Sequence, residues 1–284
     1  MLVGAGADVN ASHPSSGRET ALQIATAWDN IELVRVLLGA GADVNAPPST
    51  ESGTALHGVV IAEKNSIELV RILLNAGADV NASSDADEKR TALQDAVAKG
   101  NAALVRALLD AGADVNASSG SKLTALQDAV CVNMIELVQV LLDAGADINA
   151  PATAFYGRTA LQAVAVGGST EMVQLLLNQN ADVNAPPAHA GGVTALQGAA
   201  IKGHLPIAIL LPQAGADAAA APAIFMGRSA LEGAAENGRL DILQLLNASA
   251  DTENLNRKNL SKAVMLAEKG GHHVVARILR DYPS

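Results

Sequence analysis

The sequence predicts an all-α solenoid of helix–turn–helix units joined by hairpin-like fingers. Two motifs share one period of 33 to 37 residues, which is the mark of a repeat architecture. Hydrophobic residues make up 49 % of the chain but aromatic residues only 2 %, which suits thin helices packed closely on one another. The first motif, Thr-Ala-Leu or Ser-Ala-Leu, begins at Thr20, Thr54, Thr91, Thr124, Thr159, Thr194 and Ser229. The second, Asp-Val-Asn or Asp-Ile-Asn, begins at Asp8, Asp43, Asp79, Asp114, Asp147 and Asp182.

Each unit begins with a short first helix. The motif Thr can cap this helix, because its hydroxyl accepts a hydrogen bond from an early backbone N–H. Small residues follow, as in the segment 94–98, which reads Gln-Asp-Ala-Val-Ala. A Gly-Asn or Gly-His pair, such as Gly100-Asn101, then ends the helix.

A second, amphipathic helix follows in each unit. In the segment 31–38, Leu and Val recur at helical spacing, and Glu32 and Arg35 point to solvent. The apolar face of that segment consists of Leu33, Val34, Leu37 and Leu38. Gly41 ends the helix in a left-handed turn. The Asp-Val-Asn motif then leads into a finger rich in Pro, Ser and Gly, which returns to the next Thr.

This order of helix, turn, helix and finger resembles the ankyrin-repeat family. The family signature Thr-Pro-Leu-His-x-Ala is altered here, because Ala replaces Pro in all seven units. Gln replaces His in five units, His57 keeps it, and Glu232 stands there in the last unit. The Thr-Ala-Leu-Gln and Asn-Ala-Pro-Pro motifs are similar to those of ankyrin arrays in large fungal multidomain proteins. The resemblance implies an ankyrin-repeat solenoid, and it is specific for fold rather than for function.

The repeats divide the chain into three segments. Residues 1–19 read as the remnant of a repeat with its finger, residues 20–251 as seven repeats, and residues 252–284 as a degenerate capping repeat with a polar outer face. The start aligns with the end of a second helix. We therefore expect residue 1 to be a cut or a misassigned start within a longer protein and residue 284 to lie near a natural C-terminus; the alternative is an array that ends in a frayed half-repeat.

The unit that begins at Thr194 is predicted to be the weakest. Pro206 falls in the first turn of its second helix, where a missing N–H is tolerated. Pro212 falls near the end of the same helix, where a lost hydrogen bond and a ring clash cost about 3 kcal/mol.

Composition argues against several classes of partner. The net charge of −10, without a basic stripe, disfavours nucleic acids and predicts a partner that is neutral or basic. No apolar stretch reaches the roughly 20 residues that a membrane span needs, and the N-terminus does not read as a signal peptide. With Cys131 as the single cysteine, these features predict a cytoplasmic, intracellular protein that does not bind membranes.

Few residues are candidates for catalysis. Asp95 and Asp128 occupy the same position in consecutive first helices, so their backbones are expected about 8–10 Å apart, which could suit two carboxylates acting on one substrate. The favoured interpretation is that both accept local backbone hydrogen bonds or face solvent. His57 replaces the recurrent Gln, a position that hydrogen-bonds locally in the family. No motif predicts a metal ion or a cofactor, and the chain is expected not to be an enzyme.

The resemblance implies binding through the fingers and the ends of the first helices, which line a concave groove. The apolar candidates in the groove are Val132, Val166 and Ile201. The candidates on the fingers are Phe155, Tyr156, Phe225 and Met226, with Trp28 as a further aromatic anchor. These residues predict a non-catalytic protein-binding or scaffolding module. The alternative is a small-molecule-binding protein or an unusual enzyme that uses the same groove, with Asp95, Asp128, His57 or Trp28 in its site.

Overall fold

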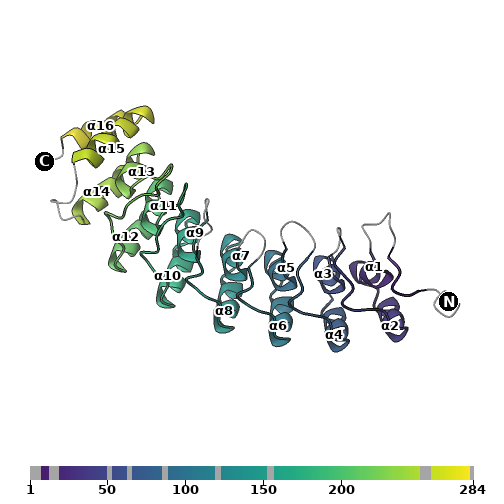
Figure 1. Ribbon diagram of the computed structural model, residues 1–284. Helices are drawn as coiled ribbons and strands as arrows, with labels where there is room; N and C mark the ends of the chain where they lie inside the picture. The colour runs from purple at the N-terminus through teal and green to yellow at the C-terminus, as the bar shows by residue number, and fades with distance from the viewer. Residues whose placement is uncertain are drawn as a thin grey trace. The chain divides into compact units, whose positions relative to one another are not determined.

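A computed structural model describes most of the chain as helical repeats (Figure 1). The described residues are 8–12, 19–49, 53–62, 66–84, 89–118, 123–151, 157–249 and 257–281. Within these ranges there are sixteen α-helices, and extended structure is limited to isolated bridges. The chain forms two compact units, Met1–Asp147 (unit 1) and Ile148–Ser284 (unit 2).

Unit 1 contains four helix pairs. First helices of about two turns stack on one another, and longer second helices pack beside them. The pairs are α1 (Ala21–Ala27) with α2 (Ile31–Gly39), α3 (Ala55–Ile61) with α4 (Ile67–Asn75), α5 (Ala92–Ala98) with α6 (Ala102–Asp110), and α7 (Ala125–Cys131) with α8 (Ile135–Asp143).

Unit 2 also contains four pairs, and in the last of them it is the first helix, α15, that packs on α13. The pairs are α9 (Ala160–Gly167) with α10 (Thr170–Asn178), α11 (Ala195–Lys202) with α12 (Leu205–Gln213), α13 (Ala230–Glu236) with α14 (Leu240–Ser249), and α15 (Arg257–Lys269) with α16 (His273–Arg280). None of the described helices has the length and apolar character required to cross a membrane.

The core is thin and almost wholly aliphatic. In the pair α5–α6 it consists of Leu93, Ala96, Val97, Leu104, Val105 and Leu108, all of them buried. The predicted apolar face of the segment 31–38 is correct for Val34 and Leu37, whereas Leu33 is 42 % exposed and Leu38 is half-buried. Among the described residues, no second helix precedes α2 to cover Leu33, while the equivalent Leu69 on α4 is buried.

In α1, α5, α9 and α11, a buried Gln side chain joins the first helix to the next finger. At Gln94 the amide oxygen accepts from the Thr91 N–H at 2.9 Å and completes a capping box. Its Nε2 donates to the carbonyl oxygens of Ala117 and Leu123 in the following finger, at 3.1 and 2.9 Å. The same two-way bonding recurs at Gln23, Gln162 and Gln197. The Thr-Ala-Leu-Gln motif is therefore both a helix cap and a joint between repeats.

The Asp-Val-Asn motif forms a second joint, the asparagine ladder. The Asn45 Oδ1 accepts from the Asp79 N–H of the next repeat at 2.8 Å, and its Nδ2 donates to the Gly77 carbonyl at 2.9 Å. The other rungs are formed by Asn10, Asn81, Asn116, Asn149 and Asn184. Ala219 takes the Asn position in the unit that begins at Thr194, so no further rung is made from it.

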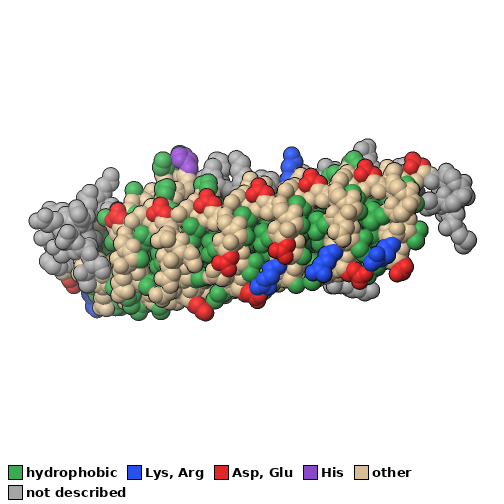
Figure 2. Space-filling model, turned by 90° about the horizontal axis from the view of Figure 1, so that it is seen from below, with side chains coloured by type: hydrophobic (Ala, Val, Ile, Leu, Met, Phe, Trp, Pro, Cys, Tyr) green, Lys and Arg blue, Asp and Glu red, His purple; other side chains and the backbone are tan. Residues whose placement is uncertain are grey.

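Ion pairs lie on the outer face of the second helices. Arg35 pairs with Glu68 at 3.0 Å, and Arg106 pairs with Glu136 at 2.9 Å, each across two neighbouring second helices of unit 1. Figure 2, seen from the second-helix side, shows such acidic and basic side chains next to one another. These pairs are more than half exposed and contribute little to stability.

The helix with two prolines keeps its length. α12 spans nine residues, as α2, α4, α6, α8 and α10 do, with Pro206 in its first turn and Pro212 inside its last. Its apolar face is buried through Ile207, Ala208 and Leu211. The ring of Pro212 leaves the Ala208 carbonyl without its helical donor.

We predict that Pro212→Leu, which introduces the residue found at this position of α2, α4, α6, α8 and α10, raises the stability of this repeat by up to about 3 kcal/mol. In the natural chain, amide hydrogen exchange among the helical repeats should be fastest between about Leu205 and Ala221, because one poor unit lowers local stability without unfolding its neighbours. Exchange measured by mass spectrometry should slow in this segment in the variant. Equal protection of all repeats in the natural chain would contradict the prediction.

Candidate functional site

His57 makes the joint that Gln makes in other repeats. Its Nδ1 lies 2.8 Å from the Thr54 Oγ1, and its Nε2 lies 3.0 Å from the Arg90 carbonyl oxygen. The side chain is buried, and burial lowers the pKa of the imidazole, against the opposing effects of the Arg90 carbonyl and the Asp95 charge. Both ring nitrogens thus have internal partners, which supports the structural interpretation of His57.

Arg90 bridges the two candidate carboxylates. Its Nε lies 2.7 Å from the Asp95 Oδ1, and its Nη2 lies 2.9 Å from the Asp128 Oδ2. The same Nη2 donates to the Gln94 carbonyl at 2.7 Å. Burial lowers the pKa of Arg90, but the hydrogen bonds and negative charges of the two carboxylates outweigh it and raise the pKa overall. The bridge ties the finger before α5 to α5 and α7.

The structure brings His57, Asp95 and Asp128 together through this one arginine. Sequence reasoning did not single out Arg90 and missed its role. The available signal was its position directly before Thr91, where the finger returns to the helix and a long side chain reaches both first helices. The two carboxylates accept bonds from the Arg90 side chain, a partner that the favoured interpretation of local backbone bonds or solvent exposure did not include.

The candidate groove residues of unit 1 lie where first helices end. Trp28 follows α1 and is 79 % exposed, and Val132 follows α7 and is 41 % exposed. Cys131, beside Val132, is also exposed. These side chains place exposed apolar surface at the ends of two first helices of unit 1.

The corresponding residues of unit 2 are partly covered. Val166 lies against Gly198, where an added Cβ would come within 2.6 Å of its Cγ2. Ile201 lies against Gly233 in the same way, at 2.3 Å from its Cγ1. Both side chains are half-buried, so they pack one first helix on the next and leave only part of their surface to a partner.

Apolar side chains are exposed at the last described finger of unit 2. Ile224, Phe225 and Met226 are 74 %, 58 % and 76 % exposed. Phe155 and Tyr156, the other two finger candidates, lie outside the described residues. The described half of the predicted aromatic finger surface is therefore exposed, and Ile224 extends it.

Two neighbouring fingers of unit 2, residues 185–193 and 220–228, pair with each other. The Phe225 N–H donates to the His189 carbonyl at 3.3 Å, and the Gly191 N–H donates to the Phe225 carbonyl at 2.9 Å. The His189 ring meets the Phe225 ring edge to face, with centroids 5.2 Å apart. Sequence reasoning did not predict this contact. The described bridges of unit 1, such as Ser83 with Thr91, instead close a single finger on itself.

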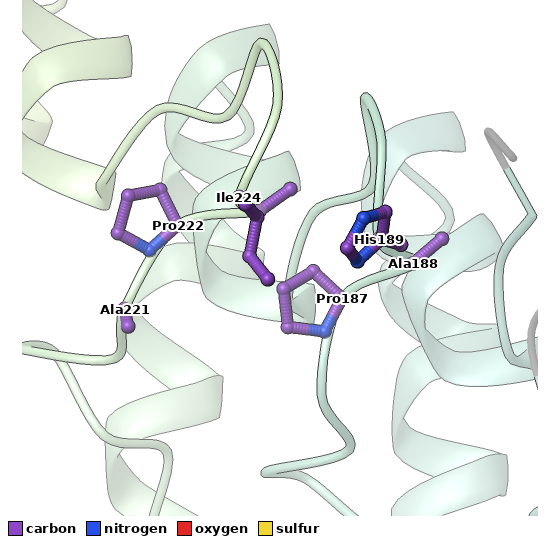
Figure 3. Close-up of a pocket in the computed structure, with 7 residues that line it drawn as sticks. Pro187, Ala188, His189, Ala221, Pro222 and Ile224 are labelled. Atoms are coloured by element: carbon purple, nitrogen blue, oxygen red, sulfur yellow. The ribbon is translucent and has the colours of Figure 1, made fainter. Parts of the chain in front are cut away.

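A pocket of about 320 Å³ opens between these paired fingers (Figure 3). Pro187 from one finger and Pro222 and Ile224 from the other surround it, and none of its lining residues is acidic, lysine or arginine. The complete lining is Pro187, Ala188, His189, Ala221, Pro222, Ala223 and Ile224. Among the described residues, no group of three or more His, Cys, Asp or Glu side chains is arranged to hold a metal ion.

We predict that Arg90→Met destabilises the protein by about 2–3 kcal/mol, because it leaves two largely buried carboxylates without their cation. Replacing both carboxylates as well, with Asp95→Ala and Asp128→Ala, should recover part of the loss, since Ala is the residue at position 163 of this column. Urea unfolding of the single and triple variants measures both values. A triple variant less stable than Arg90→Met alone would show that the carboxylates have other, more important partners.

We predict that His57→Gln removes a pH dependence of stability. The folded pKa of His57 is lowered from its ordinary value of 6.5, which means that the folded protein favours the neutral imidazole. The stability that His57 contributes is therefore fully present above pH 6.5 and is lost as the pH falls through the folded pKa. The free energy of unfolding of the natural chain, relative to the variant, should therefore fall as the pH drops below about 6.5. The other histidines are the same in the natural chain and the variant, so they do not contribute to this difference. A difference that does not change with pH would contradict the assignment.

Comparison with known proteins agrees with this repeat architecture. The family model described as ankyrin repeats (3 copies) matches residues 1–84, 35–119, 56–152 and 126–221. The crystal structure of the ankyrin repeat domain of Bcl-3, titled a unique member of the IkappaB protein family, matches with a TM-score of 0.67 and 33 % identity over 80 % of this chain and 98 % of that chain. None of the curated proteins compared matches the sequence. The chain belongs to the ankyrin-repeat family.

Proposed function

We propose that the chain is a non-catalytic protein-binding or scaffolding module that uses its fingers and the ends of its first helices. Ankyrin repeats are generally protein-interaction modules. The observation that carries the proposal is the exposed cluster Ile224, Phe225 and Met226, in a chain with only five aromatic residues. Exposed apolar clusters mark interaction sites, because they are unfavourable in water until a partner covers them.

The internal bonding of the candidate catalytic residues supports a non-catalytic role. Asp95 and Asp128 share the Arg90 guanidinium, and His57 bonds Thr54 and a backbone carbonyl. The alternative is a small-molecule site or an unusual enzyme in the groove. The pocket between the paired fingers is the feature that favours it, since its volume is at the lower end of ligand sites.

The charge distribution supports a neutral or basic partner. Residues 1–147 contain 9 Lys and Arg against 19 Asp and Glu, whereas residues 148–284 contain 10 of each. The whole net charge of −10 therefore belongs to unit 1, which would repel nucleic acid and attract basic segments. The proposed setting is the cytoplasm, which suits the single cysteine.

The proposed segments are those that the repeats predict: a remnant in residues 1–19, seven repeats in 20–251 and a cap in 252–284. The pairs from α1 to α14 fall within the second segment, and α15 with α16 falls within the third. The exposed charges of Glu268, Lys269 and Arg280 support a capping role for the last pair.

We predict that the double variant Phe225→Ala and Met226→Ala lowers affinity for a partner, captured from the native cell, by at least about 2 kcal/mol, which is about 30-fold. The reason is that aromatic and Met side chains bury much area at little entropic cost. Calorimetry with the purified partner measures the effect. Ile209→Ala on α12 is the matched control, since Ile209 is exposed and lies on a second helix.

The same loss is expected for the double variant Phe155→Ala and Tyr156→Ala. Thermal unfolding of both double variants should match that of the natural chain. Unchanged affinity in both, or a large loss of thermal stability, would remove these residues from the binding surface.

A further inference from the structure

We propose that the pocket between the paired fingers of unit 2 binds one uncharged aromatic side chain of a partner peptide. The inference rests on the proposed function and names what the partner presents to this surface. It is carried by the chemistry of the lining, the rigidity of the two fingers, the volume of the pocket and its exposed rim.

The lining favours a flat, uncharged group. Pro187 and Pro222 come from different fingers and present pyrrolidine rings to the pocket, with Ile224 between them (Figure 3). Pyrrolidine rings pack well on aromatic faces, which is the basis of proline-rich peptide recognition with the two roles exchanged. A charged side chain would lose its hydration without meeting an opposite charge, because the lining offers none. The neutral balance of residues 148–284 adds no long-range attraction for a charged anchor.

The pocket is held in shape before a ligand arrives. The two backbone hydrogen bonds at Phe225 and the edge contact with His189 link the fingers. Each finger is also closed by a glycine whose backbone packs tightly against an alanine of the same finger. An added Cβ at Gly192 would lie 2.2 Å from the Ala188 nitrogen, and one at Gly227 would lie 2.4 Å from the Ala223 nitrogen. Ordering two linked fingers therefore adds little to the free-energy cost of binding.

The surroundings of the pocket indicate a peptide rather than a free small molecule. Its volume of about 320 Å³ takes one large side chain and lies at the lower end of the range of ligand sites. The exposed Phe225 and Met226 follow directly after Ile224 and remain uncovered when the pocket alone is filled. Residues that flank the anchor in a peptide would cover them. An aromatic anchor in a pocket with neutral contacts around it is the usual form of an interface hot spot.

The test uses single side chains as probes on the full chain. N-acetyl-tryptophanamide, N-acetyl-leucinamide and N-acetyl-lysinamide are titrated into ¹⁵N-labelled protein, and amide shifts of Ala188, His189 and Ile224 are followed by NMR. The tryptophan probe should bind in the millimolar range, at least about tenfold more tightly than the other two. Ile224→Glu should abolish the shifts, whereas the control Ile209→Glu, on α12, should keep them. Both positions are exposed, and thermal unfolding confirms that each variant folds.

A second arm separates a peptide from a small molecule. The peptide acetyl-Gly-Gly-Trp-Gly-Gly-amide should bind more tightly than the tryptophan probe, and Met226→Ala, which keeps the contact between Phe225 and His189, should reduce that gain. Equal binding of the leucine probe overturns the aromatic preference, and tighter binding of the lysine probe overturns the uncharged one. Shifts that persist in Ile224→Glu place the binding elsewhere. A partner that loses affinity in the Phe225 and Met226 variant, while the probes do not bind, sinks this inference and leaves the proposed function standing.

Discussion

A buried side-chain amide is the contact on which the stack depends. The oxygen of each such Gln accepts from the Thr N–H of its own repeat, whereas the nitrogen finds its partners only when the next finger is in place. At Gln162 the nitrogen donates to the carbonyls of Ala185 and Pro186, at 2.9 and 3.0 Å. A next finger that covered the amide without offering these carbonyls would leave the nitrogen buried and unsatisfied, which is unfavourable by about 1–3 kcal/mol. These hydrogen bonds therefore make the stability of each repeat depend on its neighbour more strongly than a thin aliphatic core alone would.

Where the amide is replaced, the joint changes its chemistry but not its place. His57 reaches the carbonyl of Arg90 with an imidazole that burial keeps neutral. Glu232 has no donor, and its buried carboxylate instead accepts from the Lys262 Nζ of α15 at 2.9 Å. The contact between α13 and α15 is accordingly ionic, whereas the preceding joint at Gln197 is neutral. Repeats that look alike in their helices are held together by interactions with different sensitivities to pH and salt.

The sequence predicted the fold because two motifs with one period report local structure, as the cap at Thr91 and the turn at Gly41 illustrate. The candidate site was predictable only in part. Exposure of Phe225 follows from its place in a finger, but its pairing with His189 depends on how two fingers meet, which no local pattern encodes. The bridge from Arg90 to Asp128 spans 38 positions, and a long flexible side chain has no fixed direction in a sequence. Contacts between repeats therefore had to come from the structure.

The hydrogen bonds of the asparagine ladder set the register of the stacked repeats independently of the length of each finger. Its rungs lie at the base of each finger, before the tip begins, and they form equally well where the next Thr follows the Asn by 8 positions, as after Asn116, or by 10, as after Asn149. Insertions and deletions at the tips can thus accumulate during evolution while the helices remain aligned. The same property makes the fingers suitable places for grafting foreign loops, because the base supplies the anchoring and the tip is free to vary.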